Sequence, residues 1–254
     1  MSIKTDEPAL AYEQVSKRYG GVSALDWVSL KIERGSFVAL VGESGSGKSS
    51  LLRLANRLDT PDQGRVLIDG QDVAHGDPIQ LRRNIGYVFQ NIGLFPHMNV
   101  AENIAIIPRL SGHDSVDVSA ALAQVGLPAD FANRLPAQLS GGQQQRVGIA
   151  RALAGGGKLL LMDEPFGALD PVTRDTLGRT VRDLHDALGL TTILVTHDMA
   201  EALLLAERII VMAHGKIVAD ATPREMLAGM AGPEADALVA IPREQAKRLA
   251  DLRE

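Results

Sequence analysis

The sequence of 254 residues predicts an α/β fold with a mostly parallel sheet, an N-terminal antiparallel β subdomain and an α-helical insert. Three observations predict this fold. Short, wholly apolar runs alternate with helical patterns, which is typical of parallel strands buried on both faces. Near the N-terminus, partly alternating runs are separated by glycine turns. A mostly helical stretch then interrupts the strand pattern.

The apolar runs of strand length are expected at residues 37–41, 158–163, 192–196 and 208–212. Each is too short for a buried helix and is bounded by polar or turn residues. Helices are expected between them, at residues 51–58, 171–188 and 198–206. This alternation of strand and helix predicts one sheet covered by helices on both faces.

The N-terminal runs at residues 11–19, 28–32 and 65–68 predict a small antiparallel sheet against the first helix. The helical insert is expected within residues 91–157, with helices at 99–109, 115–125 and 141–154. We expect a main domain over residues 11–230, followed by a helical tail over 231–254.

Composition and charge narrow the classes of function. The chain has 26 basic and 31 acidic residues, a net charge of −5, which argues against a nucleic-acid partner. Because cysteine is absent, disulfides, thiolate metal sites and thiol nucleophiles are excluded. No apolar run approaches the ~18–20 residues of a membrane span.

A glycine-rich loop joins the first apolar strand to the first helix and fits the pattern G-x₄-G-K-[ST]. Its residues are Gly42, Glu43, Ser44, Gly45, Ser46, Gly47, Lys48, Ser49 and Ser50. In such a P-loop the backbone N–H groups and the helix N-terminus converge on phosphate oxygens. Lys48 adds a charge for the outer phosphates, and the Ser49 hydroxyl can bind Mg²⁺. The alternative is a turn that only connects strand to helix. The loop and its flanking elements predict a P-loop NTPase core.

Two carboxylates end the apolar strand at residues 158–163. Asp163 is placed to reach Mg²⁺, and Glu164 to orient or deprotonate an attacking water. A strand ending in Asp-Glu is often only a solvated strand end. A P-loop upstream in the same predicted sheet favours the catalytic interpretation.

A second candidate anion site precedes the helix that carries Arg146 and Arg151. The loop contributes Ser140, Gly141, Gly142 and Gln143. The simpler interpretation is a capped helix start, with serine as N-cap. A nucleotide needs one phosphate cradle, however, and this chain has two. Two chains placed head to tail would let each nucleotide lie between one P-loop and the partner's Ser140 loop.

The pentapeptide Leu-Ser-Gly-Gly-Gln at residues 139–143, together with the P-loop and the Asp163-Glu164 strand, resembles the nucleotide-binding subunit of ABC transporters. The resemblance covers about residues 11 to 230. It implies that Tyr19 stacks on adenine and that Gln90 senses Mg²⁺ and the membrane partner. It also implies that Asp170 lies at the dimer seam and that His197 contacts the γ-phosphate. Taken singly, these four residues could be a core aromatic, surface caps and a strand-end histidine.

Within this family, four segments resemble the sequences of the quaternary-amine branch, whose members import glycine betaine, carnitine and choline. They are residues 56–58, 81–97, 101–105 and 167–174. Many members continue into paired CBS modules, for which the residues after the core are too few. The resemblance implies a peripheral ATPase on the cytoplasmic face of the inner membrane, working with ATP and Mg²⁺. The expected partners are permease subunits, a second copy and, indirectly, a solute-binding protein.

An apolar loop at residues 92–98 is the expected docking surface for the permease. The alternative is that its side chains pack into the insert. Other functions also remain open at this point: an importer of another solute such as an amino acid or polyamine, a non-transport ABC ATPase, and a regulatory P-loop protein without turnover. The last would be expected to lack Glu164 or His197, and both are present.

Overall fold

The computed structural model describes residues 7–112 and 116–251, which form two compact units. Unit 1 comprises the described residues up to Ala74 and those from Leu194 onward. Unit 2 comprises the described residues from His75 to Ile193. The α/β class predicted from the sequence is confirmed, and each unit combines strands with helices.

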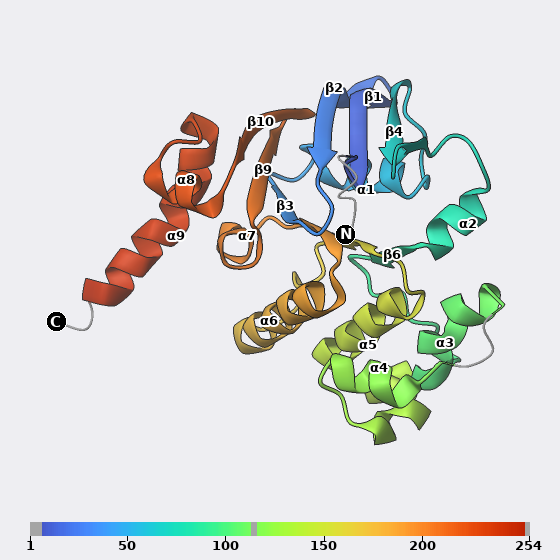
Figure 1. The fold of residues 1–254 in the computed structure, drawn as a ribbon. Coiled ribbons are helices and arrows are strands. Elements are labelled where there is room, and N and C mark those ends of the chain that lie inside the picture. Colours follow the sequence, from blue (N-terminus) through green and yellow to red (C-terminus); the bar gives the residue numbers. More distant parts are fainter. Residues whose placement is uncertain (1–6, 113–115, 252–254) are drawn as a thin grey trace, which may run out of the picture. The chain divides into compact units, whose positions relative to one another are not determined.

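The N-terminal sheet of unit 1 has the strand order β2-β1-β4-β5 (Figure 1). Its antiparallel strands are β1 (Leu10–Tyr19), β2 (Val22–Ile32), β4 (Gln63–Ile68) and β5 (Gln71–Asp72). The sheet packs against α1 (Lys48–Ala55), and the buried Tyr12 hydroxyl donates to the Leu51 carbonyl at 2.9 Å. The predicted antiparallel subdomain is therefore present, with β2 longer than the sequence suggested.

A second sheet in unit 1 carries the glycine-rich loop. Its strands are β3 (Phe37–Val41), parallel to β9 (Arg208–Ala213), and β10 (Lys216–Ala221), antiparallel to β9. All five residues of β3 are at most 1% exposed, as expected for a strand covered on both faces. The next strand beside β3 is β8 (Thr191–Val195), within which the boundary of the two units falls.

Three helices complete unit 1: α7 (Met199–Leu205), α8 (Pro223–Ala228) and α9 (Pro233–Asp251). The sequence predicted the first and the third of these. It missed β10 and α8, which are short elements of mixed polarity. The last three residues of the predicted tail, 252–254, lie outside the described residues.

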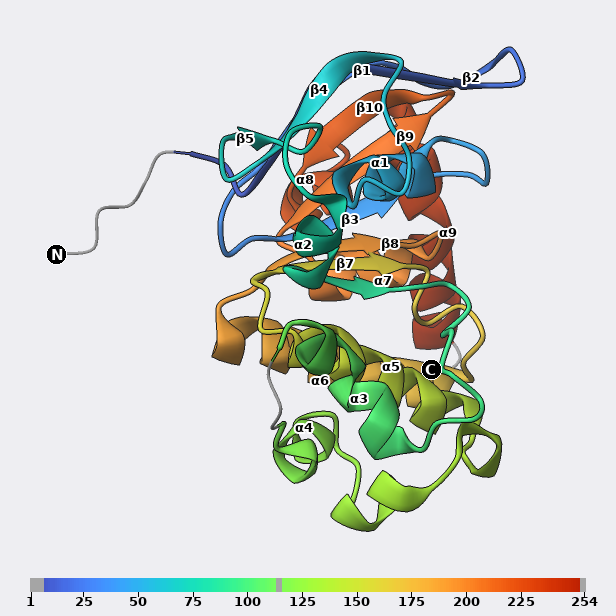
Figure 2. The same ribbon diagram turned by 90° about the vertical axis from the view of Figure 1, so that its right-hand side faces the viewer.

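Unit 2 holds two parallel strands, β6 (Ile85–Val88) and β7 (Leu159–Asp163), with β8 beginning beside β7. The helices described in unit 2 are α2 (Pro78–Arg83), α3 (Val100–Leu110), α4 (Val118–Gln124), α5 (Gly141–Ala154) and α6 (Pro171–Leu188), with 3₁₀ turns at Ala129–Asn133 and Pro136–Gln138. Figure 2 shows α3, α4, α5 and α6 below these strands. The three helices predicted in the insert are thus present, although Ser115 lies outside the described residues.

The first helix ends earlier than its apolar pattern suggested. The pattern predicted a helix to residue 58, whereas α1 ends at Ala55 with Asn56 as its C-cap. Arg57 adopts a φ of 48°, a left-handed conformation that an α-helix cannot continue through. Leu58 instead donates its N–H to the Arg53 carbonyl at 2.8 Å, so its side chain follows a turn rather than a helix.

Candidate functional site

The glycine-rich loop of unit 1 joins β3 directly to α1. Gly47 is the N-cap of α1 at φ 107°, and a Cβ there would lie 2.5 Å from the Ala24 carbonyl oxygen. Only glycine fits this position. Because α1 begins at Lys48, its first N–H groups have no intrahelical partner and face the loop. N–H groups that converge at a helix N-terminus are suited to a phosphate group.

Lys48 lies within this loop and is buried. Its Nζ donates to the carbonyl oxygens of Gly42 at 2.7 Å and Glu43 at 2.8 Å, and approaches Ser46 Oγ at 3.3 Å. The ammonium is thus fixed by the loop's own backbone. A cation held beside converging N–H groups makes the loop electropositive, which favours an anion.

Tyr19, at the end of β1, is held by acidic groups that the sequence analysis did not single out. Tyr19 is 42% exposed, and its hydroxyl donates to Asp59 Oδ2 at 2.5 Å. Lys17 Nζ lies 3.3 Å from Asp59 and 3.0 Å from Asp62, and 5.4 Å from the Tyr19 ring centroid. Period-2 alternation puts Lys17 and Tyr19 on one face of β1, a signal visible in the sequence. The two aspartates come from the turn after α1, so only the fold brings them here.

The pKa values in this cluster are shifted by the same contacts. Hydrogen bonding to Asp62 raises the pKa of Lys17 despite partial burial. Burial alone would raise the pKa of Asp59, but hydrogen bonds from Tyr19, the Thr60 N–H and Lys17 outweigh it and lower that pKa. Burial and the contact with Asp59 raise the pKa of Tyr19. At neutral pH the cluster therefore holds a cationic lysine, an ionised aspartate and a protonated tyrosine.

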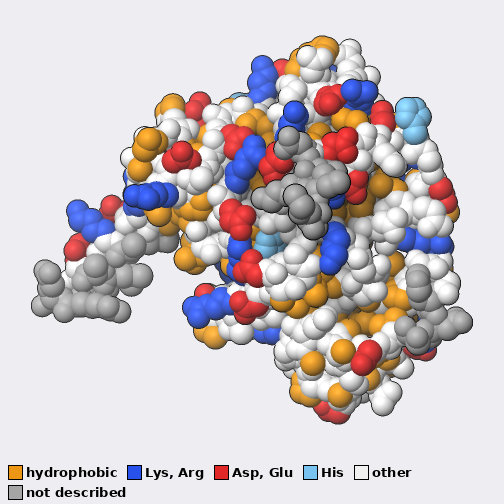
Figure 3. Space-filling model, viewed as in Figure 1, with side chains coloured by type: hydrophobic (Ala, Val, Ile, Leu, Met, Phe, Trp, Pro, Cys, Tyr) orange, Lys and Arg blue, Asp and Glu red, His pale blue; other side chains and the backbone are white. Residues whose placement is uncertain are grey.

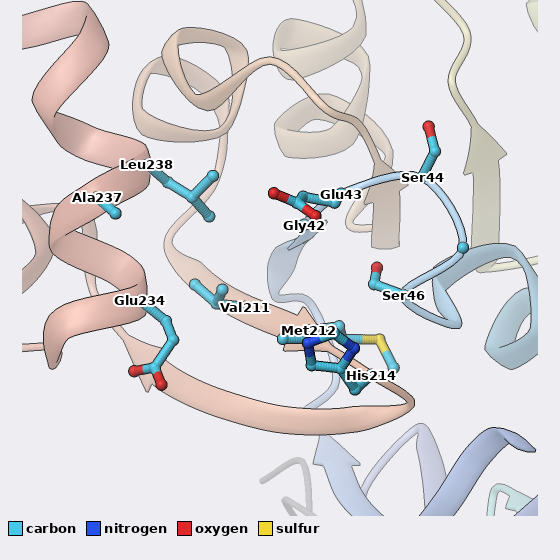
Figure 4. Close-up of a pocket in the computed structure, with 12 residues that line it drawn as sticks. Gly42, Glu43, Ser44, Ser46, Val211, Met212, His214, Glu234, Ala237 and Leu238 are labelled. Atoms are coloured by element: carbon cyan, nitrogen blue, oxygen red, sulfur yellow. The ribbon is translucent and has the colours of Figure 1, made fainter.

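A cavity of about 340 Å³ lies beside the loop, between β9 and α9. Figure 4 shows Leu238 of α9 and Glu43 of the loop directed toward this space. Its other lining residues include Val211, Met212 and Glu234. The glycine-rich loop itself forms part of the wall, through residues 42–46, and the Glu234 carboxylate and several apolar side chains form most of the rest.

In unit 2, two of the predicted catalytic residues, Gln90 and Glu164, are in contact. Asp163 ends β7, and Glu164 follows at φ 46°, in the left-handed region that is uncommon for a non-glycine residue. Gln90 follows β6, and its Nε2 donates to Glu164 Oε2 at 3.2 Å. Because β6 and β7 are parallel neighbours, their carboxyl ends meet at one sheet edge. Strained backbone at such an edge is typical of functional sites.

The loop before α5 is a capped helix start. Ser140 Oγ accepts from the Gln143 N–H at 3.3 Å, and Gln143 Oε1 accepts from the Ser140 N–H at 2.9 Å. This capping box occupies the side chains of both residues. The N–H groups of Gly141 and Gly142 are the first of α5 and have no partner within the helix. The simpler interpretation and the anion-site interpretation are therefore compatible.

Asp170 is the N-cap of α6, and its carboxylate accepts from the N–H groups of Val172 at 3.1 Å and Thr173 at 3.0 Å. Its hydrogen bonds to Thr173 and Val172 lower the pKa of Asp170. A Cβ on Gly142 would lie 2.6 Å from Thr173 Cγ2, so the starts of α5 and α6 pack tightly. Unit 2 thus places the Ser140 loop beside the start of α6, where Asp170 is the N-cap.

The three predicted metal ligands offer oxygens of the kind that Mg²⁺ prefers: a hydroxyl from Ser49, an amide from Gln90 and a carboxylate from Asp163. Ser49 lies in unit 1, at the start of α1, and the other two lie at neighbouring strand ends of unit 2. His197 lies in unit 1 just after β8 and is exposed. It directly precedes Asp198, the N-cap of α7.

Among the described residues, no helix combines the length and apolar character needed to cross a bilayer. The family model of the ABC transporter matches residues 25–167. The carnitine transport ATP-binding protein OpuCA of Listeria monocytogenes is 48% identical over 223 residues, covering 86% of this chain and 56% of that protein. The glycine betaine uptake system ATP-binding protein YehX of Escherichia coli is 46% identical over 222 residues, covering 86% and 72%.

The fold is also similar to that of solved ATP-binding cassettes. A dimeric post-hydrolysis state of the ATP-binding cassette MJ0796, bound to ADP and Pi, has a TM-score of 0.77 and is 36% identical, covering 85% of this chain and 99% of that one. Just over half the length of the Listeria relative is spanned by this chain. The family model covers more than half of the sequence, and the fold, the loop and the strand-end carboxylates agree with it. The chain belongs to the ABC transporter family.

Proposed function

We propose that the chain is the ATP-hydrolysing subunit of an ABC importer, with ATP as substrate and Mg²⁺ as cofactor. The observation that carries the proposal is the contact of Gln90 with Glu164, one residue after Asp163 at the end of a buried strand. A carboxylate held by a glutamine beside a candidate metal ligand is suited to orienting water for attack on a phosphoryl group.

In the proposed reaction, water attacks the γ-phosphorus and the bond to the β–γ bridging oxygen breaks, giving ADP and phosphate. Glu164 accepts the proton of the attacking water. The loop N–H groups and Lys48 stabilise charge on the phosphates, while His197 contacts the γ-phosphate and Tyr19 stacks on adenine. When bound by Ser49, Asp163 and Gln90, Mg²⁺ supplies charge neutralisation on the phosphate oxygens.

We further propose that two copies form a head-to-tail dimer around two nucleotides. Each nucleotide would lie between the Lys48 loop of one copy and the partner's Ser140 loop. The N–H groups at the start of α5 and the position of Asp170 beside them support this arrangement. A similar cassette of known structure is dimeric, with ADP and Pi bound.

The proposed membrane partners are separate permease subunits, which would hold the chain at the cytoplasmic face of the inner membrane. A solute-binding protein would act through them. Figure 3 shows basic and acidic side chains mixed over the visible face, which agrees with a net charge of −5 and does not favour nucleic acid.

The proposed cargo is a quaternary-amine osmoprotectant such as glycine betaine, carnitine or choline. The similar transport proteins of Listeria monocytogenes, Bacillus subtilis and Escherichia coli, named for carnitine, choline or glycine betaine, support this class. A second candidate is an inorganic anion, because the sulfate/thiosulfate import protein CysA of Mesostigma viride is 47% identical over 222 residues. The cargo contacts belong to other subunits, so this chain's site does not separate the two.

The test is to co-express the chain with the permease and solute-binding genes adjacent to its own and to reconstitute the complex in liposomes. We expect ATP-dependent uptake of radiolabelled glycine betaine, carnitine or choline, and little uptake of sulfate. Uptake of sulfate alone would move the proposal to the second candidate. A purified complex that releases no phosphate from ATP would refute the enzymatic function itself.

A further inference from the structure

A buried arginine of unit 2 holds the loop that follows Gln90. Arg151, near the end of α5, is 8% exposed. Its Nη1 donates to the Gly93 carbonyl and its Nη2 to the Ile92 carbonyl, both at 2.7 Å. Burial lowers the pKa of its guanidinium, so holding this charge inside the unit has a cost that the two short hydrogen bonds offset.

The preceding turn of α5 packs on the same loop. A Cβ added to Gly148 would lie 3.0 Å from Ile92 Cγ2, so the helix and the loop are already in close contact. Gly148 and Arg151 are three residues apart and therefore lie on one face of α5. Gly93 adopts φ 60°, which turns its carbonyl and that of Ile92 toward the same face.

A second buried polar side chain holds the rest of the loop. Asn103 of α3 is fully buried. Its Oδ1 accepts from the Phe95 N–H at 2.8 Å, and its Nδ2 donates to the carbonyls of Phe95 at 3.2 Å and Met98 at 3.0 Å. Side chains from two helices therefore hold the backbone of this loop.

This anchoring leaves apolar side chains on the outside. Phe89 is 43% exposed and Phe95 40% exposed, on either side of the segment that Arg151 holds. At the inner end, Gln90 contacts the carboxylate of Glu164. One loop, fixed by two buried groups, thus presents an apolar surface at one side and a catalytic contact at the other.

We propose that Arg151 and Asn103 are positioning residues that keep the loop of residues 91–98 rigid, so that docking of the permease on it is transmitted to Gln90 and Glu164. This proposal rests on the proposed function and adds the residues through which the transport machinery would control hydrolysis. Rigidity matters because a loop free to rearrange would absorb a displacement instead of passing it on.

The discriminating variant is Arg151→Lys. Lysine keeps the charge but cannot offer two fixed N–H groups to two carbonyls. The matched control is Arg146→Lys, because Arg146 lies on the same helix and donates to a carbonyl elsewhere, that of Val125 at 2.6 Å. Asn103→Ala removes the second anchor in the same loop.

Two measurements are made on these variants. In the isolated chain, amide hydrogen exchange of the 91–98 segment should speed up about tenfold in Arg151→Lys and Asn103→Ala, the size expected for losing a charge-assisted or fully buried hydrogen bond. Arg146→Lys should leave this segment unchanged. In the reconstituted complex, stimulation of hydrolysis by the binding protein loaded with glycine betaine should fall about tenfold in the first two variants only, while basal hydrolysis stays within about twofold.

Unchanged exchange in Arg151→Lys would overturn the positioning role. Faster exchange with stimulation retained would overturn the link to the permease. An equal loss in Arg146→Lys would show a general effect on α5 and would also overturn the proposal. A wild-type complex without any hydrolysis would refute the proposed function and with it the transmission, while hydrogen exchange would still decide whether Arg151 holds the loop.

Discussion

The glycine-rich loop of unit 1 and the loop after Gln90 in unit 2 are held in different ways. The loop around Lys48 is held from within: its lysine donates to two carbonyls five and six residues back in the same loop. The loop after Gln90 is held from outside, by Arg151, almost 60 residues away in the sequence, and by Asn103. The first geometry is local and appears as a motif, whereas the second exists only once α3 and α5 have packed.

The largest effect is expected at Glu164, the carboxylate that Gln90 contacts. Glu164→Gln keeps the size of the side chain but removes the base, so hydrolysis should fall by roughly 10²–10⁴-fold. ATP should still bind, because Lys48 and the loop N–H groups are untouched. Phosphate release measured under single turnover checks this, with ATP affinity measured in parallel.

The same variant tests the dimer. With ATP trapped, Glu164→Gln should sediment as a dimer with ATP and as a monomer without it. Adding Ser140→Arg places bulk and charge at the partner's phosphate site and should abolish the dimer while each chain still binds ATP. A double variant that still dimerises with ATP would remove the Ser140 loop from the site.

The next largest effect is expected in ATP affinity, when the glycine-rich loop loses its lysine. Lys48→Ala removes a charge-assisted contact worth roughly 1.5–3 kcal/mol, so ATP affinity should fall about tenfold or more. Lys158→Ala is a matched control, because Lys158 also donates to a backbone carbonyl, that of Leu188, but belongs to unit 2 and not to the glycine-rich loop. Titration with ATP should separate the two, and equal affinities would refute the P-loop assignment.

This contrast explains how much the sequence could predict. The buried strands, the long helices and the P-loop were predicted because each depends on a contiguous pattern: apolar runs, 3.6-residue periodicity and glycine spacing. The short elements β10 and α8 were missed because six residues of mixed polarity carry little periodic signal. The end of α1 was wrong because the left-handed Arg57 follows from packing and not from propensity.

The residues of the candidate site likewise fall into those that a contiguous pattern predicts and those that only the fold brings together. The two carboxylates at the end of β7 and the glycine loop could be singled out from the residues alone, and their roles stay predictions. The acidic partner of Tyr19 could not be predicted, because Asp59 is more than 35 residues from it in sequence. Arg151 left a faint signal, a charge within the apolar face of α5, but nothing in the sequence points to the carbonyls that it holds. Nor does any pattern place Asn103 against Phe95. The roles of Tyr19, Gln90, Asp170 and His197 stay predictions.

A smaller effect is expected at Tyr19. Removing the ring in Tyr19→Ala should weaken ATP binding by about 1 kcal/mol, or roughly fivefold, through lost stacking. Tyr19→Phe keeps the ring and removes only the bond to Asp59, so its ATP affinity should stay within about twofold of the wild type. If both variants lose stability and neither loses affinity, Tyr19 is a structural residue of β1 rather than an adenine contact.

The smallest effect is expected in the pH dependence of stability, through the charged groups Asp59 and Lys17 beside Tyr19. The pKa of Asp59 is lowered in the folded chain, so its contacts contribute stability above the ordinary aspartate pKa, and this contribution is lost as the pH falls through the lowered value. The pKa of Lys17 is raised, so its contribution is present below the ordinary lysine pKa and is lost as the pH rises through the raised value. Between these limits Asp59→Asn should lower the free energy of unfolding by about 1 kcal/mol, the usual size for one hydrogen-bonded pair. Urea unfolding of both proteins from pH 3 to pH 8 checks this, with the difference shrinking at the acid end, where Asp59 becomes protonated. A difference that does not change across this range would mean that Asp59 acts through its shape alone, and that the charges of the cluster do not hold Tyr19 in place.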